Sequence, residues 1–253
     1  MTQKRKIYFI SDVHLGAPAL NNNRERELLF ASWLDNIRDD VEELYLMGDI
    51  FDFWYEYKKV VPRGFTRILG RLADLTDKGI PVHFFTGNHD MWVYDYLAEE
   101  TGINVHHDYI IREIHGKRFF LAHGDGLDAS DTGYIFLKKI FTNTTMRWLF
   151  SRLHPNFAFH IAHKWSASSR LSNADYNEDF MANKDGMYKF AADFLQTNPI
   201  DYFVMGHRHK LVNEKMNEKT RFIILGDWIK AFSYGVFDGE NFELKTYKDE
   251  AKA

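Results

Sequence analysis

The chain contains no cysteine. This absence excludes disulfide bonds, redox sensing by thiols and thiolate metal ligands. Any metal must therefore be held by histidine, carboxylate and amide side chains, a donor set that favours manganese, iron, magnesium or a histidine-rich zinc site.

Long apolar runs and a strong excess of charge are also missing. No run approaches the length of a membrane span, and the cluster Lys4-Arg5-Lys6 is not followed by the apolar stretch of a signal peptide. We therefore expect a cytoplasmic protein. A net charge of −4 and a pI near 6.3 speak against a nucleic acid partner, although a local basic patch stays compatible with them.

Five apolar, β-prone segments are each followed by residues of the types that bind metals. Continuous apolar runs are typical of buried strands, and the carboxyl ends of buried parallel strands meet at one edge, where α/β proteins bind ligands. We therefore expect one site rather than five separate turns. The five junctions are Asp12-Val13-His14, Gly48-Asp49 with Asp52 beyond it, Gly87-Asn88-His89-Asp90, His123-Gly124-Asp125 and Gly206-His207-Arg208-His209.

The spacing within these junctions is typical of metal ligands. Asp12 and His14, two residues apart after a strand, can both turn toward one cation, and His207 and His209 repeat this arrangement. Asp49 can bridge two cations. Such oxygen and imidazole ligands are typical of paired divalent metals about 3.5–4 Å apart, which activate a water molecule and bind phosphate oxygens. The candidate ligands are Asp12, His14, Asp49, Asn88, His123, His207 and His209.

His89 is the candidate for acid catalysis. An imidazole next to Asn88 can protonate a leaving group or bind a phosphate oxygen. By itself, a Gly-Asn-His-Asp sequence is more often an ordinary polar turn. The other four junctions favour the functional interpretation.

The order of the elements predicts an α/β protein that forms a single domain over residues 1–253. Amphipathic helices are expected at about Arg24–Ile37 and Phe65–Thr76, and they alternate with the first three strands. The apolar face of the first helix is predicted to comprise Leu28, Leu29, Trp33, Leu34 and Ile37.

An aromatic, helical insertion over residues 127–199 separates the junctions of His123 and His207. Its many large apolar residues are interleaved with lysine and arginine. Two interpretations stay open: a helical subdomain whose aromatic residues form a core of their own, or an apolar and cationic lid over the site.

The five junctions, in this order, resemble those of the calcineurin-like metallophosphoesterase superfamily. The resemblance spans residues 7 to about 237 and implies a four-layer α/β/β/α sandwich that holds two divalent metal ions. Manganese is the expected ion, with iron, zinc and magnesium as alternatives. One metal would be bound by Asp12, His14, Asp49 and His209, and the other by Asp49, Asn88, His123 and His207. His89 would be the catalytic imidazole, and Asp52 would orient it.

Within this superfamily, the chain is most similar to the UDP-2,3-diacylglucosamine pyrophosphohydrolases of lipid A biosynthesis. The similarity rests on Ser11-Asp12-Val13-His14-Leu15-Gly16, on His123-Gly124-Asp125-Gly126-Leu127 and on Leu225-Gly226-Asp227-Trp228. It implies hydrolysis of a lipid-linked sugar nucleotide to UMP and 2,3-diacylglucosamine 1-phosphate. The insertion would form the lid, and the enzyme would bind peripherally to the anionic surface of the inner membrane. The implied substrate contacts are Asn88, His89, Asp131, Ser166, Arg170, Asn173 and His207.

His89 departs from the pattern of the well-studied branch, which has arginine at this position. A sugar phosphate leaves as a stabilised anion, since its second pKa is about 6, so a charge-neutralising arginine suffices there. An alkoxide needs a proton. His89 therefore keeps another phosphomonoester or phosphodiester substrate open, including a nucleotide or nucleic acid. A non-catalytic scaffold is disfavoured because every ligand position is filled.

Overall fold

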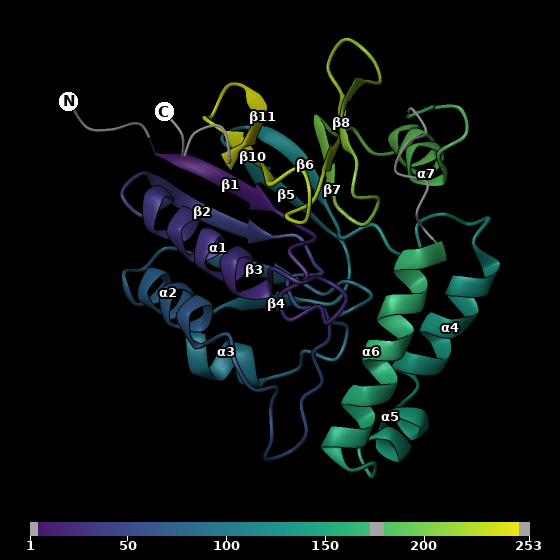
Figure 1. Cartoon of the computed structure of the whole chain (residues 1–253). Coiled ribbons are helices and arrows are strands. Elements are labelled where there is room, and N and C mark those ends of the chain that lie inside the picture. Colours follow the sequence, from purple (N-terminus) through teal and green to yellow (C-terminus); the bar gives the residue numbers. More distant parts are fainter. Residues whose placement is uncertain (1–4, 173–179, 248–253) are drawn as a thin grey trace.

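The computed structural model of the protein describes residues 5–172 and 180–247, which form two stacked β-sheets with helices on both outer faces (Figure 1). The first sheet has the strand order β11-β10-β1-β2-β3-β4 and the second has the order β5-β6-β7-β9-β8. The strands are β1 (Lys6–Ile10), β2 (Val41–Leu46), β3 (Val82–Phe85), β4 (Asn104–His106), β5 (Ile110–Ile114), β6 (Lys117–Leu121), β7 (Tyr202–Met205), β8 (Leu211–Lys215), β9 (Arg221–Leu225), β10 (Ser233–Phe237) and β11 (Phe242–Thr246).

Three helices cover the outer face of the first sheet. Its strands β1 to β4 run parallel, and each crossover between them carries a helix, as parallel pairing requires. The helices and the sheet share one core, in which Phe30, Trp33 and Trp228 are fully buried and in ring contact. These helices are α1 (Asn23–Ile37), α2 (Thr66–Asp77) and α3 (Tyr96–Thr101).

The apolar face of α1 differs in one position from its predicted face. Leu28 is 45% exposed, whereas Phe30 is completely buried. Leu28 was therefore predicted wrongly, and the helical period explains why: residues 26, 30, 33, 34 and 37 share one face of the helix, and Leu28 lies on the opposite side from Phe30.

A second core fills the space between the sheets. The ring of Phe9 from β1 stacks on Tyr45 at 5.0 Å and on Phe119 of the second sheet at 5.9 Å. Burying an aromatic side chain of this size stabilises the fold by about 1.5–3 kcal/mol. This core holds the two sheets together face to face, so their strand ends are presented at a common edge.

Helix α7 (Gly186–Leu195) covers the outer face of the second sheet. Its residues Met187 and Ala191 are buried against Phe120 and Phe203. The four layers are thus helices, sheet, sheet and helix, and the predicted sandwich is confirmed. Helix α7 belongs to the insertion by sequence but packs as an outer layer of the sandwich.

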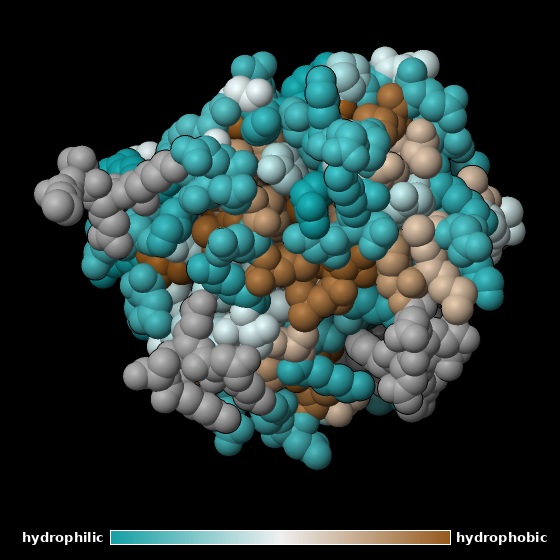
Figure 2. All heavy atoms as spheres, turned by 90° about the horizontal axis from the view of Figure 1, so that it is seen from above, coloured by the Kyte–Doolittle hydropathy of each residue, from teal (hydrophilic) through white to brown (hydrophobic). Residues whose placement is uncertain are grey.

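The other helices of the insertion extend away from the sandwich (Figure 1). They are α4 (Thr132–Thr142), α5 (Thr144–Phe150) and α6 (Pro155–Ser172). Their outer surface is apolar in places: Phe136 is 64% exposed, and Trp148 and Phe157 are each 55% exposed. By contrast, the face in Figure 2 is largely hydrophilic, with apolar atoms gathered near its middle. No helix in residues 5–172 and 180–247 has both the length and the apolar character that a membrane span requires.

Candidate metal centre

The five predicted junctions converge where the strands of both sheets end. Strands β1, β2 and β3 supply Asp12, Asp49 and Asn88, and strands β6 and β7 supply His123 and His207. Five of the seven candidate ligands have a left-handed backbone, which is uncommon for residues other than glycine and concentrates at functional sites. Their φ angles are 55° for Asp12, 47° for His14, 53° for Asp49, 70° for His207 and 52° for His209.

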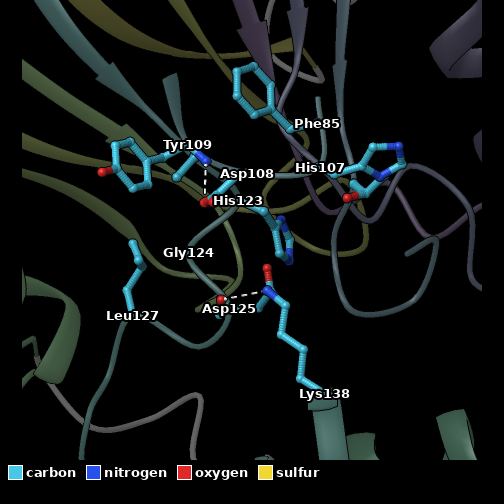
Figure 3. A pocket seen from close by; sticks show the side chains of 11 residues that line it. Phe85, His107, Asp108, Tyr109, His123, Gly124, Asp125, Leu127 and Lys138 are labelled. Carbon is cyan, nitrogen blue, oxygen red and sulfur yellow. Dashed lines mark hydrogen bonds and ion pairs between the residues drawn. The ribbon is translucent and has the colours of Figure 1, made fainter. Parts of the chain in front are cut away.

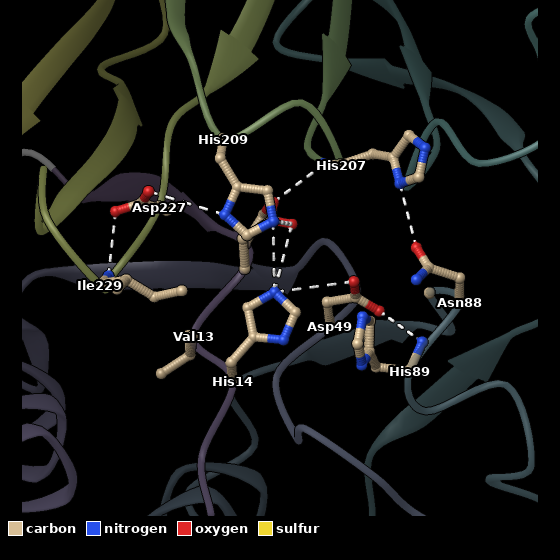
Figure 4. Close-up of polar contacts among 12 residues, drawn as sticks. Val13, His14, Asp49, Asn88, His89, His207, His209, Asp227 and Ile229 are labelled. Atoms are coloured by element: carbon tan, nitrogen blue, oxygen red, sulfur yellow. Dashed lines mark hydrogen bonds and ion pairs between the residues drawn. The ribbon is translucent and has the colours of Figure 1, made fainter. Parts of the chain in front are cut away.

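One group of donors forms around Asp12. Nε2 of His209 lies 3.4 Å from Oδ1 of Asp12 and 3.3 Å from Nε2 of His14. Nε2 of His14 is also 3.8 Å from Oδ2 of Asp49. Ligands of one cation approach one another at such distances, and Figure 4 shows His14 and His209 facing each other beside Asp49.

The other group forms on the opposite side of Asp49. Nε2 of His123 is 3.4 Å from Oδ2 of Asp49 and 3.4 Å from Oδ1 of Asn88. Nδ1 of His207 is 3.0 Å from the same Asn88 oxygen. Asp49 therefore lies in both groups, as a bridging carboxylate would.

The side chains fit a pair of divalent cations. Oδ1 of Asp12 is completely buried and accepts no hydrogen bond from the residues that the structure describes. A buried carboxylate oxygen without a donor is costly unless a cation or water approaches it. Carboxylate, amide and imidazole donors suit manganese, iron, zinc or magnesium.

A surrounding layer orients the imidazole rings. Nδ1 of His123 lies 2.8 Å from the carbonyl oxygen of Met47, so it donates its proton there and leaves Nε2 free for the centre. Nδ1 of His209 lies 3.6 Å from Oδ2 of Asp227, and Oδ1 of the same carboxylate accepts three backbone N–H groups of its own turn. Such partners fix the tautomer of a ligand.

The electrostatics of the centre leave two histidines neutral and let a third share a proton with Asp49. Burial lowers the pKa of His14 and of His207 to about 4, so both rings are neutral. Although burial acts against it, the carboxylate of Asp49 raises the pKa of His123 to about 10. Burial also opposes the shift of Asp49, yet the neighbouring His123 and His89 hold its pKa well below the usual range. A cation would replace the proton that His123 and Asp49 otherwise share.

His89 lies at the edge of this centre. Its backbone N–H donates to Oδ1 of Asp49 at 2.8 Å, and its ring is 4.7 Å from that of His14. Nδ1 of His89 lies 2.9 Å from the backbone carbonyl of Asp52, whereas the Asp52 carboxylate is 3.9 Å away. That carboxylate is closer to Nδ1 of His14, at 3.6 Å. Asp52 thus contacts His89 mainly through its main chain, and its predicted orienting role stays a prediction.

Asp90 lies in the site, although the sequence predicted no role for it. Its buried carboxylate accepts the backbone N–H groups of Gly87 at 2.7 Å, Ile50 at 2.9 Å, Phe51 at 3.2 Å and Asp49 at 3.3 Å. It therefore ties the junction after β2 to the junction after β3. The glycine in this motif is required by space, because a Cβ on Gly87 would collide with Asp49.

Arg26 also supports the site, and its role was not predicted from the sequence. It lies on α1 among polar residues, yet it is buried and donates to the carbonyl oxygens of Val13 at 3.2 Å and His14 at 2.6 Å. It thus holds the loop that carries two ligands. The acceptors are backbone atoms, which give no signal in the sequence.

The structure describes the side chain of only one of the substrate-binding residues that were predicted in the insertion. Asp131 is exposed and is the N-cap of α4, where its carboxylate accepts the N–H of Tyr134 at 3.0 Å. Ser166 and Arg170 lie on α6, but their side chains are outside the described part of the chain, and Asn173 lies outside the described residues. Their predicted roles stay predictions.

A buried carboxylate links α4 to the centre. Oδ2 of Asp125 accepts the hydroxyl of Tyr134 and the ammonium of Lys138, each at 2.6 Å. Although burial acts to raise it, Lys138 and His123 lower the pKa of Asp125. Because Asp125 follows His123 by two residues, this cluster sets the position of α4 relative to a metal ligand.

Comparison with known proteins agrees with this geometry. The profile of the family described as calcineurin-like phosphoesterase matches residues 5–211. The chain therefore belongs to the calcineurin-like phosphoesterase family, and its donor groups are those of a metal-dependent hydrolase.

Among curated relatives, the chain is similar to proteins named UDP-2,3-diacylglucosamine hydrolase. It is 40% identical to that of Porphyromonas gingivalis over 97% of this chain and 99% of the relative. It is 30% identical to that of Histophilus somni, over 88% and 92%, and 28% identical to that of Haemophilus influenzae, over 96% and 98%.

Proposed function

We propose that this protein hydrolyses the pyrophosphate of UDP-2,3-diacylglucosamine to UMP and 2,3-diacylglucosamine 1-phosphate. The observation that carries the proposal is the pair of donor groups that share Asp49, in a chain 40% identical to a relative named for this substrate. The expected cofactors are two divalent ions, with Mn²⁺ as the expected metal. Asp12, His14, Asp49 and His209 would hold one, and Asp49, Asn88, His123 and His207 the other.

The residues of the centre have distinct tasks. Two bound cations would polarise a water molecule and the substrate's phosphate oxygens. His89 donates from Nδ1 to the Asp52 carbonyl, so its Nε2 is the atom available to the phosphate or the leaving group. The leaving sugar phosphate is a stabilised anion, so His89 serves mainly to bind and neutralise charge, with proton donation as a second capability.

The fate of the solvent oxygen tests the reaction. Water adds to the α-phosphorus of the UDP group, the bond from that phosphorus to the bridging oxygen breaks, and the sugar phosphate leaves. In water labelled with oxygen-18, the label should appear in UMP. Mass spectrometry of both products is the measurement, and label found only in the lipid phosphate would contradict the assigned point of attack.

We further propose that α4, α5 and α6 form a lid that binds the acyl chains. These helices carry exposed Phe136, Trp148 and Phe157, and Phe53 next to the metal centre contacts Phe159 of α6 with ring centroids 4.9 Å apart. Burying each methylene of an acyl chain would stabilise the complex by about 0.8 kcal/mol.

Substrates that differ only in acyl length test the lid. The value of kcat/KM should rise with acyl length and fall for a deacylated UDP-sugar. A helical subdomain that only packs on itself predicts a flat profile. Such a profile, with equal activity on the deacylated compound, would reject the lid.

The helices α4, α5 and α6 would also bring the protein to the membrane that contains its lipid substrate, since no described helix could span that membrane. Their lysines and arginines would hold the protein at an anionic bilayer, at about 1 kcal/mol for each basic residue near it. We therefore propose peripheral binding to the cytoplasmic face of the inner membrane. The described basic residues of these helices that are not paired with Asp125 are Lys139, Arg147 and Lys164, and Arg152 lies in the turn between α5 and α6.

A further inference from the structure

An open cavity lies beside the metal centre and shares one donor, His123, with it (Figure 3). Its empty space is about 300 Å³, part of which is continuous with solvent. It is bounded by the end of β3, the turn between β4 and β5, the loop after β6 and the side chain of Lys138 from α4. Because the cavity is small and open to solvent, it suits one part of a substrate that also contacts the metals rather than a separate enclosed ligand.

His123 joins this cavity to the centre. Its Nε2 is 3.4 Å from the bridging carboxylate of Asp49, and its ring also lines the cavity. A group attached to a phosphate on the metals would therefore reach the cavity directly. In a nucleotide, the ribose follows the α-phosphate after one oxygen and one methylene.

The walls of the cavity combine flat apolar surfaces with a carboxylate. Tyr109 stacks on Phe120 with ring centroids 4.8 Å apart, which holds its ring in place, and Leu127 lies below it in Figure 3. Oδ1 of Asp108 accepts the backbone N–H of Tyr109 at 2.8 Å. Carboxylates are a group with which proteins bind ribose hydroxyls.

We propose that this cavity binds the nucleoside part of the substrate, with Asp108 accepting hydrogen bonds from the ribose hydroxyls and the base lying between Tyr109 and Leu127. This inference rests on the proposed function, because it assumes that a nucleoside diphosphate occupies the centre. The residues that would recognise the nucleoside are neither metal ligands nor part of the described helices of the lid.

Competitive inhibition by UMP tests the assignment, with inorganic phosphate as the second probe. Asp108→Asn keeps an oxygen for the Tyr109 N–H but removes the charge. It should weaken inhibition by UMP about tenfold, as the loss of a hydrogen bond to a charged group does. Inhibition by phosphate should stay unchanged because the metal ligands are intact. Asp95→Asn is the matched control, since Asp95 is exposed and its side chain makes no cap hydrogen bond.

Leu127→Trp provides a second variant that fills the cavity. It should also weaken inhibition by UMP, raise KM for the UDP-linked substrate and leave the metal content unchanged. Inhibition by UMP at wild-type strength in both variants, each with a wild-type melting temperature, would overturn the inference.

The two proposals can fail separately. If the wild-type protein does not hydrolyse UDP-2,3-diacylglucosamine, the proposed substrate is wrong. The competition between UMP and phosphate can then be measured against bis-p-nitrophenyl phosphate. A selective loss of UMP inhibition in Asp108→Asn would still assign a nucleotide to the cavity, and equal losses of UMP and phosphate inhibition would reject it.

Discussion

At the scale of single residues, both donor groups depend on Asp49. It lies 3.8 Å from His14 on one side and 3.4 Å from His123 on the other, and it also accepts the N–H of His89. The main chain next to it has little room, because a Cβ on Gly48 would collide with the ring of His123. The centre thus tolerates little change at this junction.

Asp49→Ala should lose metal and activity together, whereas His89→Ala should keep its metals and lose turnover by about 10²–10³-fold, as the loss of one group that stabilises developing charge does. Metal analysis and activity assays of both purified variants check this. Asp52→Asn should reduce turnover less than His89→Ala does, because it keeps the main-chain carbonyl that Nδ1 of His89 contacts and changes only the more distant carboxylate. Equal metal loss in the Asp49 and His89 variants would contradict the separate roles.

Asp90→Asn should lower the free energy of unfolding by about 1–3 kcal/mol. Asparagine turns an N–H₂ group toward backbone N–H donors and leaves some of them unsatisfied. Urea unfolding of the variant measures the effect. Asp95→Asn, an exposed carboxylate in the same loop region, should stay within about 0.5 kcal/mol of wild type. Equal stability of the two variants would show that Asp90 does not hold the two junctions together.

At the scale of elements, two helices of the lid, α4 and α5, are fixed to the sandwich by side chains that bind their carbonyl oxygens. Nε1 of Trp92 donates to the carbonyl of Phe141 at the end of α4, and the hydroxyl of Tyr55 donates to the carbonyl of Arg147 in α5, each at 3.0 Å. Phe150 packs on both Trp92 and Tyr55. The carbonyl of Phe141 lies in the last turn of α4, where carbonyls lack partners within the helix, and Trp92 satisfies it. The carbonyl of Arg147 accepts the hydroxyl of Tyr55 in addition to the N–H of Ser151.

Tyr55→Phe should loosen α5 and destabilise the protein by about 0.5–1.5 kcal/mol, because it removes one hydrogen bond and keeps the ring. Faster proteolysis within residues 132–172 is the expected readout. Tyr57→Phe is the control: the hydroxyl of Tyr57 is buried without a hydrogen-bond partner among the described residues, so its removal should cost nothing. The same proteolysis rate in both variants would mean that Tyr55 does not anchor the lid.

At the scale of the whole molecule, the metal centre joins the two sheets. Asp12, Asp49 and Asn88 follow strands of the first sheet, while His123 and His207 follow strands of the second. Contacts such as the 3.0 Å approach of Asn88 to His207 cross from one sheet to the other. Bound cations would therefore stabilise the packing of the sheets as well as supply chemistry.

Removing metal by chelation should lower the melting temperature, and adding Mn²⁺ should restore it. A ligand present at 100 times its dissociation constant stabilises the folded state by about 2.7 kcal/mol. Thermal unfolding with and without chelator is the measurement. Asp49→Ala should respond weakly to Mn²⁺, whereas Asp95→Asn should respond as wild type does. A melting temperature indifferent to metal in the wild-type protein would contradict the centre.

The sequence alone predicted the α/β class and the junctions that carry the candidate ligands, while the four layers were implied by the resemblance to the calcineurin-like superfamily. Buried strands are continuous apolar runs, and polar residues that follow them directly must lie at the strand ends, so Asp12, Asp49 and His123 could be identified from local order. The exclusion of thiolate ligands also followed from composition. These features depend on neighbours along the chain, which the sequence shows directly.

Only the tertiary structure decided which groups support the donors. The burial of Arg26, the four amide donors on Asp90 and the approach of the Asp52 carbonyl to His89 all involve backbone atoms, some of them about forty residues away. The exposure of Leu28 and the packing of α7 on the second sheet likewise depend on which surface a neighbouring element covers. Backbone atoms are chemically alike at every position, so only folding in three dimensions selects which of them a side chain meets.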